Sequence, residues 1–370
     1  MDKKAGFTRS KKWPFALLFA LTLVLAALAV HFYAGFDSSR EEQSYTGPVR
    51  VLGSGASFPA PLYQRWFRDI YREESDIQVD YQSIGSGAGI ANFLAGRTDF
   101  AGSDYPLSES EAAKVEGGVI QLPMAAGAIV FVYNLPGIQR LNLSRGVLAD
   151  IASGKIQNWN DPRIRESNPK AALPDLKLTL VARAEASGTS FHMSSHIAAY
   201  SKTFRTQVGA SKSPNWPQAL KNRGALILAR GNFGVASMVA SVPGALGYVQ
   251  FSYAKLPNLQ MAALENRAGN MIYPSMASFR AAVASVQDHL ALEEIADPEG
   301  GDVYPLISLS WLIMRRKYND PDVLAVMKAI VRYGLTRGQE SEAAMGYIPF
   351  PRSSRKKIIE YFDKHGGSGS

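Results

Sequence analysis

Cysteine is absent from the 370-residue chain. Its absence excludes disulfides, thiolate nucleophiles, cysteine-ligated zinc and a lipid carried on an N-terminal cysteine. The fold must therefore be stabilised by a packed core. The composition permits one, because 46% of the residues are apolar, and 32 glycines and 20 prolines provide turns. A chain of this length is expected to divide into two lobes.

Positive charge is in excess, but half of that excess lies at the N-terminus. The formal net charge is +8, and residues 1–12 contribute five cations and one acidic residue. The remainder has no stripe of Lys and Arg interleaved with aromatic residues, which is the pattern of a nucleic-acid surface. We therefore predict no nucleic-acid partner.

An apolar run at residues 13–34 contains no Lys, Arg, Asp or Glu. It is longer than the roughly 7 to 15 apolar residues of a signal-peptide core and close to the roughly 20 that span a bilayer. We expect residues 1–35 to form an uncleaved N-terminal membrane anchor; the alternative is a signal peptide cleaved near Ala27. The preceding cations stay in the cytoplasm, which places the rest of the chain outside. Residues 36–49 are predicted to be a polar linker and residues 367–370 a flexible tail.

Strand and helix patterns alternate through the rest of the chain, which predicts an α/β sheet with helices on both faces. The expected strands lie near residues 50–53, 77–85, 176–183 and 242–255, with a strand pair over 303–316. Residues 119–133 are expected to form two apolar segments that Pro123 separates, as in a crossing between lobes. The expected helices begin at Pro59 and near residues 88, 142, 190, 320 and 354.

Three junctions combine glycine or alanine with a hydroxyl residue at a predicted helix start. They read GSGASFPAP (53–61), SIGSGAGIANF (83–93) and RAEASGTSFHMSSH (183–196). The first amides of a helix have no acceptor within it, so such a start either takes an ordinary N-cap or binds an anion. Three of these starts converging would surround a tetrahedral oxyanion.

Two charged residues refine this hypothesis. Arg183 lies four residues before Ser187, and a guanidinium can approach two oxygens of an anion at once. Asp104 would repel an anion unless the anion carries a proton, as monobasic and dibasic phosphate do and sulfate does not. Leaving a buried acceptor unpaired would cost several kcal/mol, so Asp104 would select phosphate. The alternative is that Asp104 is a surface or capping residue.

Together these segments resemble the periplasmic phosphate-binding proteins of bacterial ABC-type phosphate transporters. The resemblance extends over nearly the whole exported part, through GSGASFPAP, YQSIGSGAGI, DFAGSDYPLS, GKIQNWNDPRI, ARAEASGTSF, PGALGYVQFSYAK and YPL. It implies a two-lobed Venus-flytrap fold of the type II periplasmic-binding-protein class, with a cleft between the lobes and an N-terminal hydrophobic helix before it. Residues 50–127 and 303–366 would form lobe 1, and residues 128–302 would form lobe 2. The protein would act as a monomer.

The resemblance also implies a set of phosphate contacts. Lobe 1 would supply amides and hydroxyls, together with a carboxylate that accepts the phosphate proton. Lobe 2 would supply the guanidinium, further amides and hydroxyls, and an acidic residue that braces the guanidinium. In chain order these residues are Ser57, Phe58, Ser86 and Asp104 from lobe 1, and Arg183, Glu185 (the brace), Ser187, Gly188 and Thr189 from lobe 2. Phe233 replaces an acidic residue common among relatives, so we assign no site role to GNFGVA (231–236).

An enzyme is the less favoured class. His192 and His196 have a spacing that suits zinc, but HMSSH lacks the glutamate of a metalloprotease and a third ligand, so we expect helix-surface histidines. A phosphatase using Ser187 or Asp104 as nucleophile would need a metal cluster or an adjacent base. We therefore predict a periplasmic protein without a cofactor or metal that binds phosphate, is tethered by residues 13–34 and delivers to an inner-membrane ABC permease. The alternatives are a protein for sulfate, molybdate or another oxyanion, a phosphatase-like enzyme, or a surface adhesin that retains the fold.

Overall fold

The computed structural model describes residues 47–222, 224–255, 259–286 and 295–366. The predicted membrane segment at 13–34 and the tail at 367–370 lie outside the described residues. Within the described residues, no helix has the length and apolar character needed to cross a membrane. The chain from Gly47 onward forms one compact unit.

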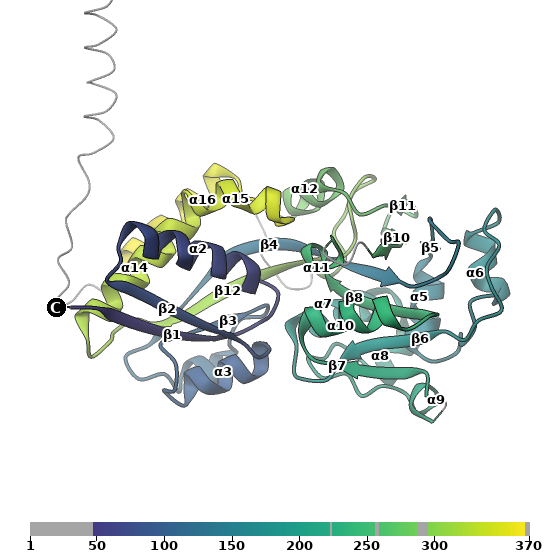
Figure 1. Ribbon diagram of the computed structural model, residues 1–370, viewed down its shortest axis with the longest axis horizontal. Helices are drawn as coiled ribbons and strands as arrows, with labels where there is room; N and C mark the ends of the chain where they lie inside the picture. The colour runs from purple at the N-terminus through teal and green to yellow at the C-terminus, as the bar shows by residue number, and fades with distance from the viewer. Residues whose placement is uncertain (1–46, 223, 256–258, 287–294, 367–370) are drawn as a thin grey trace, which may run out of the picture. The chain divides into compact units, whose positions relative to one another are not determined.

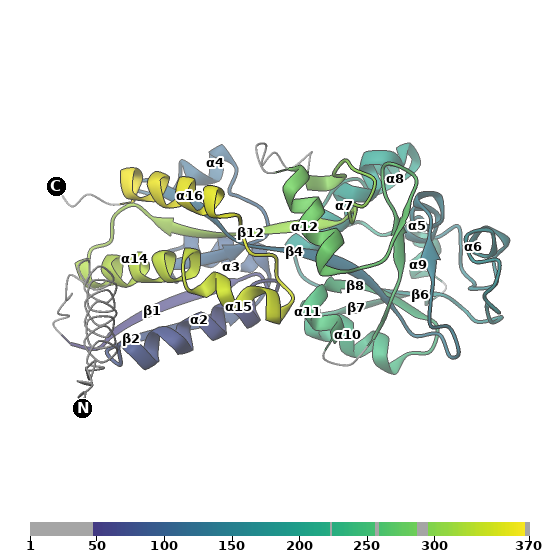
Figure 2. The ribbon, with the colours of Figure 1, turned by 90° about the horizontal axis from the view of Figure 1, so that it is seen from above.

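One mixed sheet extends through both halves of this unit (Figure 1). Its strand order is β2-β1-β3-β12-β4-β8-β6-β7, with β9 pairing with β4. The strands of the first half are β1 (Val49–Gly55), β2 (Ile77–Ser83), β3 (Phe100–Ser103) and β12 (Ile307–Arg315). The strands of the second half are β6 (Thr179–Arg183), β7 (Leu226–Ala229), β8 (Ala245–Gln250) and β9 (Gln260–Met261). The long strand β4 (Val119–Tyr133) belongs to both halves, as Figure 2 shows.

Helices cover the sheet in each half. The first half carries α2 (Ala60–Glu73), α3 (Ser86–Leu94), α4 (Glu109–Ala112), α14 (Pro321–Leu335), α15 (Gly338–Met345) and α16 (Arg352–His365). The second half carries α5 (Arg145–Ala152), α6 (Pro162–Ser167), α7 (Gly188–Tyr200), α8 (Lys202–Gln207), α9 (Gln218–Lys221), α10 (Gly231–Ser241), α11 (Phe251–Lys255) and α12 (Met276–Ser285). The second half also contains a small sheet of β11 (Met271–Ile272), β10 (Ala263–Glu265) and β5 (Asn142–Leu143).

Helix α2 shows how the sequence builds these layers. Its N-cap is Pro59, and a second proline stands in its first turn, so the helix starts without competing amide donors. Leu62, Trp66 and Ile70 repeat at helical spacing and are buried. Trp66 is fully buried, and its indole nitrogen donates to the Gly338 carbonyl of α15 at 3.2 Å. Burying a side chain of this size stabilises the fold by about 3 kcal/mol.

Strand β4 contradicts the predicted break at Pro123, because it runs unbroken for 15 residues. Within the first half β4 pairs with β12 along one side, and its partner β8 is reached only from Ile129 onward. The proline therefore lies where the strand is an edge, and the register with β12 shifts between Ser310 and Trp311, opposite it. An edge position with a register shift tolerates the missing amide hydrogen.

Three other element predictions need correction. The helix expected from residue 142 spans only Arg145–Ala152, because Ser144 caps its start and Gly154 follows it with a φ of 74°. Residues 303–316 contain one strand, β12 (Ile307–Arg315), and not the expected pair. The strand expected over 242–255 ends at Gln250 and continues as α11. The residue ranges given above for the two lobes stay a prediction.

Candidate functional site

Parallel pairing brings the predicted junctions to one region. Strand β1 runs parallel to β2 and β3, and β6 runs parallel to β7 and β8. The carboxyl ends of parallel strands meet at one edge of a sheet, and helix N-termini follow them. Consequently α2, α3, α7 and α10 all begin between the two halves. All eight predicted binding residues are buried there.

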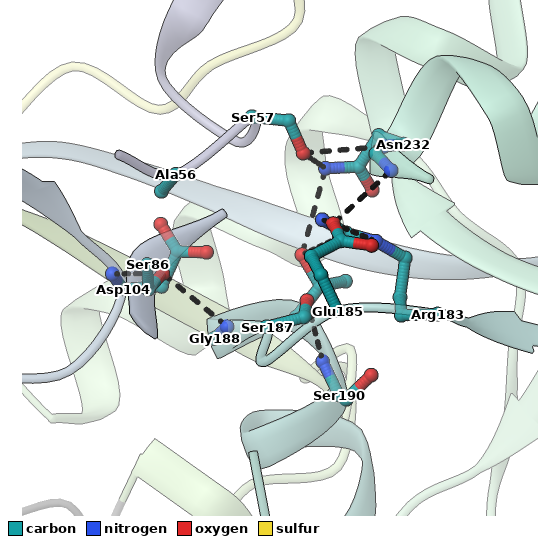
Figure 3. Close-up of polar contacts among 12 residues, drawn as sticks. Ala56, Ser57, Ser86, Asp104, Arg183, Glu185, Ser187, Gly188, Ser190 and Asn232 are labelled. Carbon is teal, nitrogen blue, oxygen red and sulfur yellow. Dashed lines mark hydrogen bonds and ion pairs between the residues drawn. The ribbon is translucent and has the colours of Figure 1, made fainter. Parts of the chain in front are cut away.

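The starts of α3 and α7 contact each other directly. Ser86 Oγ accepts the amide hydrogens of Asp104 and Gly188, each at 3.3 Å (Figure 3). The Gly87 amide donates to the Ala186 carbonyl at 3.2 Å. The Gly188 amide, which the resemblance assigns to the anion, thus donates to Ser86 in this structure. These contacts join the two halves in a closed arrangement.

Two side chains, those of Glu185 and Thr189, hold the Arg183 guanidinium in place. Its Nε donates to Glu185 Oε1 at 2.9 Å, its Nη2 also contacts that oxygen, and its Nη1 donates to Thr189 Oγ1 at 3.3 Å. The guanidinium side chain is 1% exposed. Glu185 Oε1 also accepts the Gly231 amide at 3.1 Å, while its Oε2 is buried without a partner among the described residues. The predicted brace is therefore in contact with Arg183 and with the start of α10.

Asp104 lies inside the molecule, which contradicts the surface alternative. Asp104 is 1% exposed, and its Oδ1 accepts a hydrogen bond from Ser310 Oγ at 3.0 Å. Burial raises the pKa of this carboxyl to about 7, although the Ser310 hydrogen bond and the Arg183 charge favour ionisation. A Cβ added to Gly188 would lie 2.3 Å from Asp104 Cβ, so only glycine permits this approach.

The first junction contacts the second half at Ser57. Ser57 Oγ accepts from the Asn232 backbone nitrogen at 3.1 Å and from Asn232 Nδ2 at 2.9 Å. The Tyr253 hydroxyl donates to the Ser57 carbonyl at 2.7 Å, and the Tyr347 hydroxyl donates to the Phe58 carbonyl at 2.6 Å. The Phe58 side chain is fully buried. The loop is thus fixed at its hydroxyl and at two carbonyls.

Ser187 takes the ordinary capping role that the sequence left open. Its Oγ accepts the Ser190 amide at 3.3 Å as the N-cap of α7. Thr189 Oγ1 accepts from Arg183 and, at 3.5 Å, from Asn232 Nδ2. One connected set of hydrogen bonds therefore runs from Ser57 through Asn232 and Thr189 to Arg183, and Figure 3 shows Asp104 facing the same region.

The two histidines are not on the helix surface, as was expected. Each is 1% exposed, and burial lowers the pKa of both His192 and His196 to about 4, so both are neutral at neutral pH. His192 Nε2 lies 2.6 Å from the Asp104 carbonyl, which can only accept, so Nε2 carries the hydrogen. His196 Nδ1 contacts the Ala296 carbonyl at 2.8 Å. No group of three or more possible metal ligands occurs in the described part of the chain.

Asn232 is the residue that sequence reasoning missed. It is fully buried, and it contacts two of the predicted residues, Ser57 and Thr189. Its segment, GNFGVA, follows a short strand and opens a helix with Gly231 at a φ of 66°. That is the same strand, glycine and helix-start pattern as in the other three junctions, and it could have identified a fourth.

Comparison with known proteins places this site in a family. The model of the PBP superfamily domain matches residues 42–350. A phosphate-binding protein PstS of Xylella fastidiosa is 35% identical over 333 residues, which is 89% of each chain. One of Methanocaldococcus jannaschii is 32% identical and covers 92% of this chain and 93% of its own.

The same fold occurs in solved structures. A high-affinity periplasmic phosphate-binding protein called PfluDING, with phosphate bound, aligns with a TM-score of 0.68 at 20% identity over 84% of this chain and 93% of its own. The two-lobed α/β fold is therefore confirmed, and so is the expectation of a binding protein rather than an enzyme, because the matched family consists of binding proteins. The chain belongs to the PBP superfamily and, within it, to the family of the PstS phosphate-binding proteins.

Proposed function

We propose that this protein binds inorganic phosphate outside the cytoplasmic membrane and delivers it to an ABC permease. The relatives reported above are named as phosphate-binding proteins, which supports the ligand. The proposal rests mainly on one structural observation, the position of the Asp104 carboxyl. It is buried between the two halves beside the start of α7, and the charge of Arg183 favours its ionised form. A carboxylate at an anion site is useful only for an anion that carries a proton.

The proposed contacts divide between the two halves. Ser57, Phe58 and Ser86 donate hydroxyl and amide hydrogens from the first half, and Asp104 accepts the phosphate proton. Arg183 pairs with two oxygens, while Ser187, Gly188 and Thr189 complete the shell. Glu185 keeps the guanidinium in position. No bond is made or broken, and closure excludes water, which strengthens each charged hydrogen bond.

Sulfate is the alternative ligand that one observation favours. A carboxyl with a pKa of about 7 is partly protonated at neutral pH. In its neutral form it has an O–H to donate, and sulfate could accept that hydrogen bond. The ionised form would leave two anions facing each other without a proton between them. The charge state of Asp104 therefore decides between the two ligands.

The remaining parts of the proposal concern location and assembly. The protein acts as a monomer in the periplasm, where residues 13–34 tether it to the inner membrane. Tethering would raise its effective concentration at the permease. The segments over residues 124–128 and 302–305 serve as the crossings between lobe 1 (50–127 and 303–366) and lobe 2 (128–302), about which the halves open and close.

Calorimetry on the full chain tests the ligand. Phosphate is expected to bind tightly at about pH 8, and sulfate and molybdate much more weakly, because Asp104 is then ionised. Arg183→Ala removes at least two charged hydrogen bonds of about 1.5 to 3 kcal/mol each, so phosphate affinity should fall by at least about a hundredfold. Arg332→Ala, which removes a surface pair with Asp363, is the matched control. Comparable phosphate and sulfate affinities at that pH, or an unaffected Arg183→Ala variant, would contradict the proposal.

A further inference from the structure

Ser57 is held from the opposite half of the molecule by three hydrogen bonds. It precedes α2 in the first half, whereas both of its partners lie on helices of the second half, Asn232 on α10 and Tyr253 on α11. Asn232 donates twice to Ser57 Oγ, at 3.1 and 2.9 Å, and Tyr253 donates to the Ser57 carbonyl at 2.7 Å. We call Asn232 and Tyr253 the Ser57 clasp.

The orientation of the Asn232 amide is determined by its surroundings. Asn232 is fully buried, and its Oδ1 accepts from the Gln250 backbone nitrogen at 2.9 Å. A backbone nitrogen can only donate, so the amide oxygen must face Gln250. The Nδ2 group must then face Ser57 Oγ, as Figure 3 shows.

This arrangement fixes the direction of the Ser57 hydroxyl hydrogen. A hydroxyl has two acceptor positions and one hydrogen. Asn232 occupies both acceptor positions of Ser57 Oγ. The hydrogen of Ser57 is therefore left to donate to a third group. An anion in the site is the acceptor that this geometry prepares for.

Tyr253 acts on the neighbouring peptide unit. The Ser57 carbonyl and the Phe58 N–H belong to one trans peptide and point in opposite directions. A donor on the carbonyl polarises the whole unit, which makes the N–H on the other side a stronger donor. The Tyr253 hydroxyl therefore strengthens the Phe58 amide.

We propose that the Ser57 clasp couples closure of the two halves to phosphate binding. Asn232 and Tyr253 are positioning residues, since they would act on the anion through their contacts with Ser57. The first half presents Ser57 and Phe58 correctly only when α10 and α11 lie against it. Loss of the clasp should therefore speed phosphate dissociation more than it slows association. The proposal rests on the proposed function, because it assumes that phosphate is the anion.

Three variants of the full chain test the clasp by calorimetry and stopped-flow kinetics with inorganic phosphate. Asn232→Ala removes the hydrogen bond from Nδ2 to Ser57 Oγ, together with those to Thr189 Oγ1 and from the Gln250 amide, and Tyr253→Phe removes the one to the Ser57 carbonyl. Each variant should weaken phosphate binding by at least about tenfold, mostly through dissociation. Asn232→Asp keeps the acceptor for Gln250 but turns an oxygen toward Ser57 Oγ. The Ser57 hydrogen would then donate to that carboxylate, so Asn232→Asp should lose more affinity than Asn232→Ala. Because an aspartate at this position would also repel the anion, the comparison in a Ser57→Ala background separates the redirected hydroxyl from charge repulsion.

Two controls and a double-mutant cycle complete the test. Asn134→Ala and Tyr333→Phe remove comparable hydrogen bonds at distant sites, to Ala240 and Asp69, and should leave affinity unchanged. In a Ser57→Ala background Asn232→Asp should cost less than in the wild type, because the hydroxyl it redirects is gone. Suppose that the wild type binds phosphate. The clasp alone is then overturned if Asn232→Asp loses the same affinity in both backgrounds, or if Asn232→Asp binds phosphate no more weakly than Asn232→Ala. Failure of the wild type to bind phosphate overturns the proposed function.

Discussion

Replacing Asp104 by asparagine should stabilise the protein while it damages phosphate selectivity. The two side chains have the same shape, and an asparagine oxygen can still accept from Ser310 Oγ, which lies 3.0 Å from Asp104 Oδ1. The substitution removes only the ionisable group. Any change in stability that depends on pH can then be assigned to the charge of Asp104.

The size of the effect follows from its pKa. Burial raises the pKa of Asp104 from its ordinary value of 3.8 to about 7. A carboxyl that is protonated more readily in the folded protein destabilises the fold as pH rises between those two values, and the loss is complete above the higher one. At about 1.4 kcal/mol for each tenfold change in proton affinity, the loss amounts to about 4 kcal/mol. It is absent below pH 3.8.

Urea denaturation of the full chain, in buffers without phosphate or sulfate, measures this difference. The unfolding free energy of Asp104→Asn minus that of the wild type should increase by about 4 kcal/mol from about pH 3.5 to about pH 8. Asp80→Asn is the control, because Asp80 is half exposed and paired with Arg50 at the surface, and it should show little change. A difference that stays constant with pH would refute the reasoning.

Three further predictions concern Gly188, Glu342 and the binding of sulfate. Gly188→Ala would place a Cβ 2.3 Å from Asp104 Cβ, so we expect the halves not to close and phosphate affinity, measured by calorimetry, to fall by more than about a hundredfold. Glu342 is fully buried and burial raises its pKa well above the ordinary value, so Glu342→Gln should stabilise the protein above neutral pH and lose that advantage in acid, as urea denaturation would show. Sulfate should bind the wild type about thirtyfold more tightly at about pH 6 than at about pH 8.5, because it requires the protonated Asp104, and Asp104→Asn should abolish that dependence in calorimetry.

The local pattern was sufficient to predict several residues that the structure brings together. Glycine, a hydroxyl residue and a helix start recur after strands, and parallel strands place such starts together. Ser57, Ser86 and Ser187 were found in this way, and the structure brings all three between the halves. The alternation of strands and helices predicted the α/β sheet, but it did not predict which strands pair, and β7, which pairs with β6, was not expected at all.

Residues whose role depends on a distant partner could not be predicted. Asn232 matters because the opposite half places Ser57 against it, 175 residues earlier in the chain. His192 likewise contacts the Asp104 carbonyl, 88 residues earlier in the chain, and no local spacing reveals that contact. From the sequence alone, Pro123 predicts the end of a strand. Only the pairing of β12 along one side of β4 shows that the strand continues through it.

If the proposed site binds phosphate, its charges require directed hydrogen bonds to provide most of the affinity. Arg183 is already paired with Glu185, and His192 is neutral at neutral pH. Asp104 adds either no charge or a negative one. The contacting groups therefore offer no excess positive charge to an anion. Ser57 and Ser86 each accept two N–H donors, which leaves both hydroxyl hydrogens to donate. Because such donors act only at the correct angle and distance, and buried groups are screened little by salt, phosphate affinity should depend strongly on closure and weakly on ionic strength.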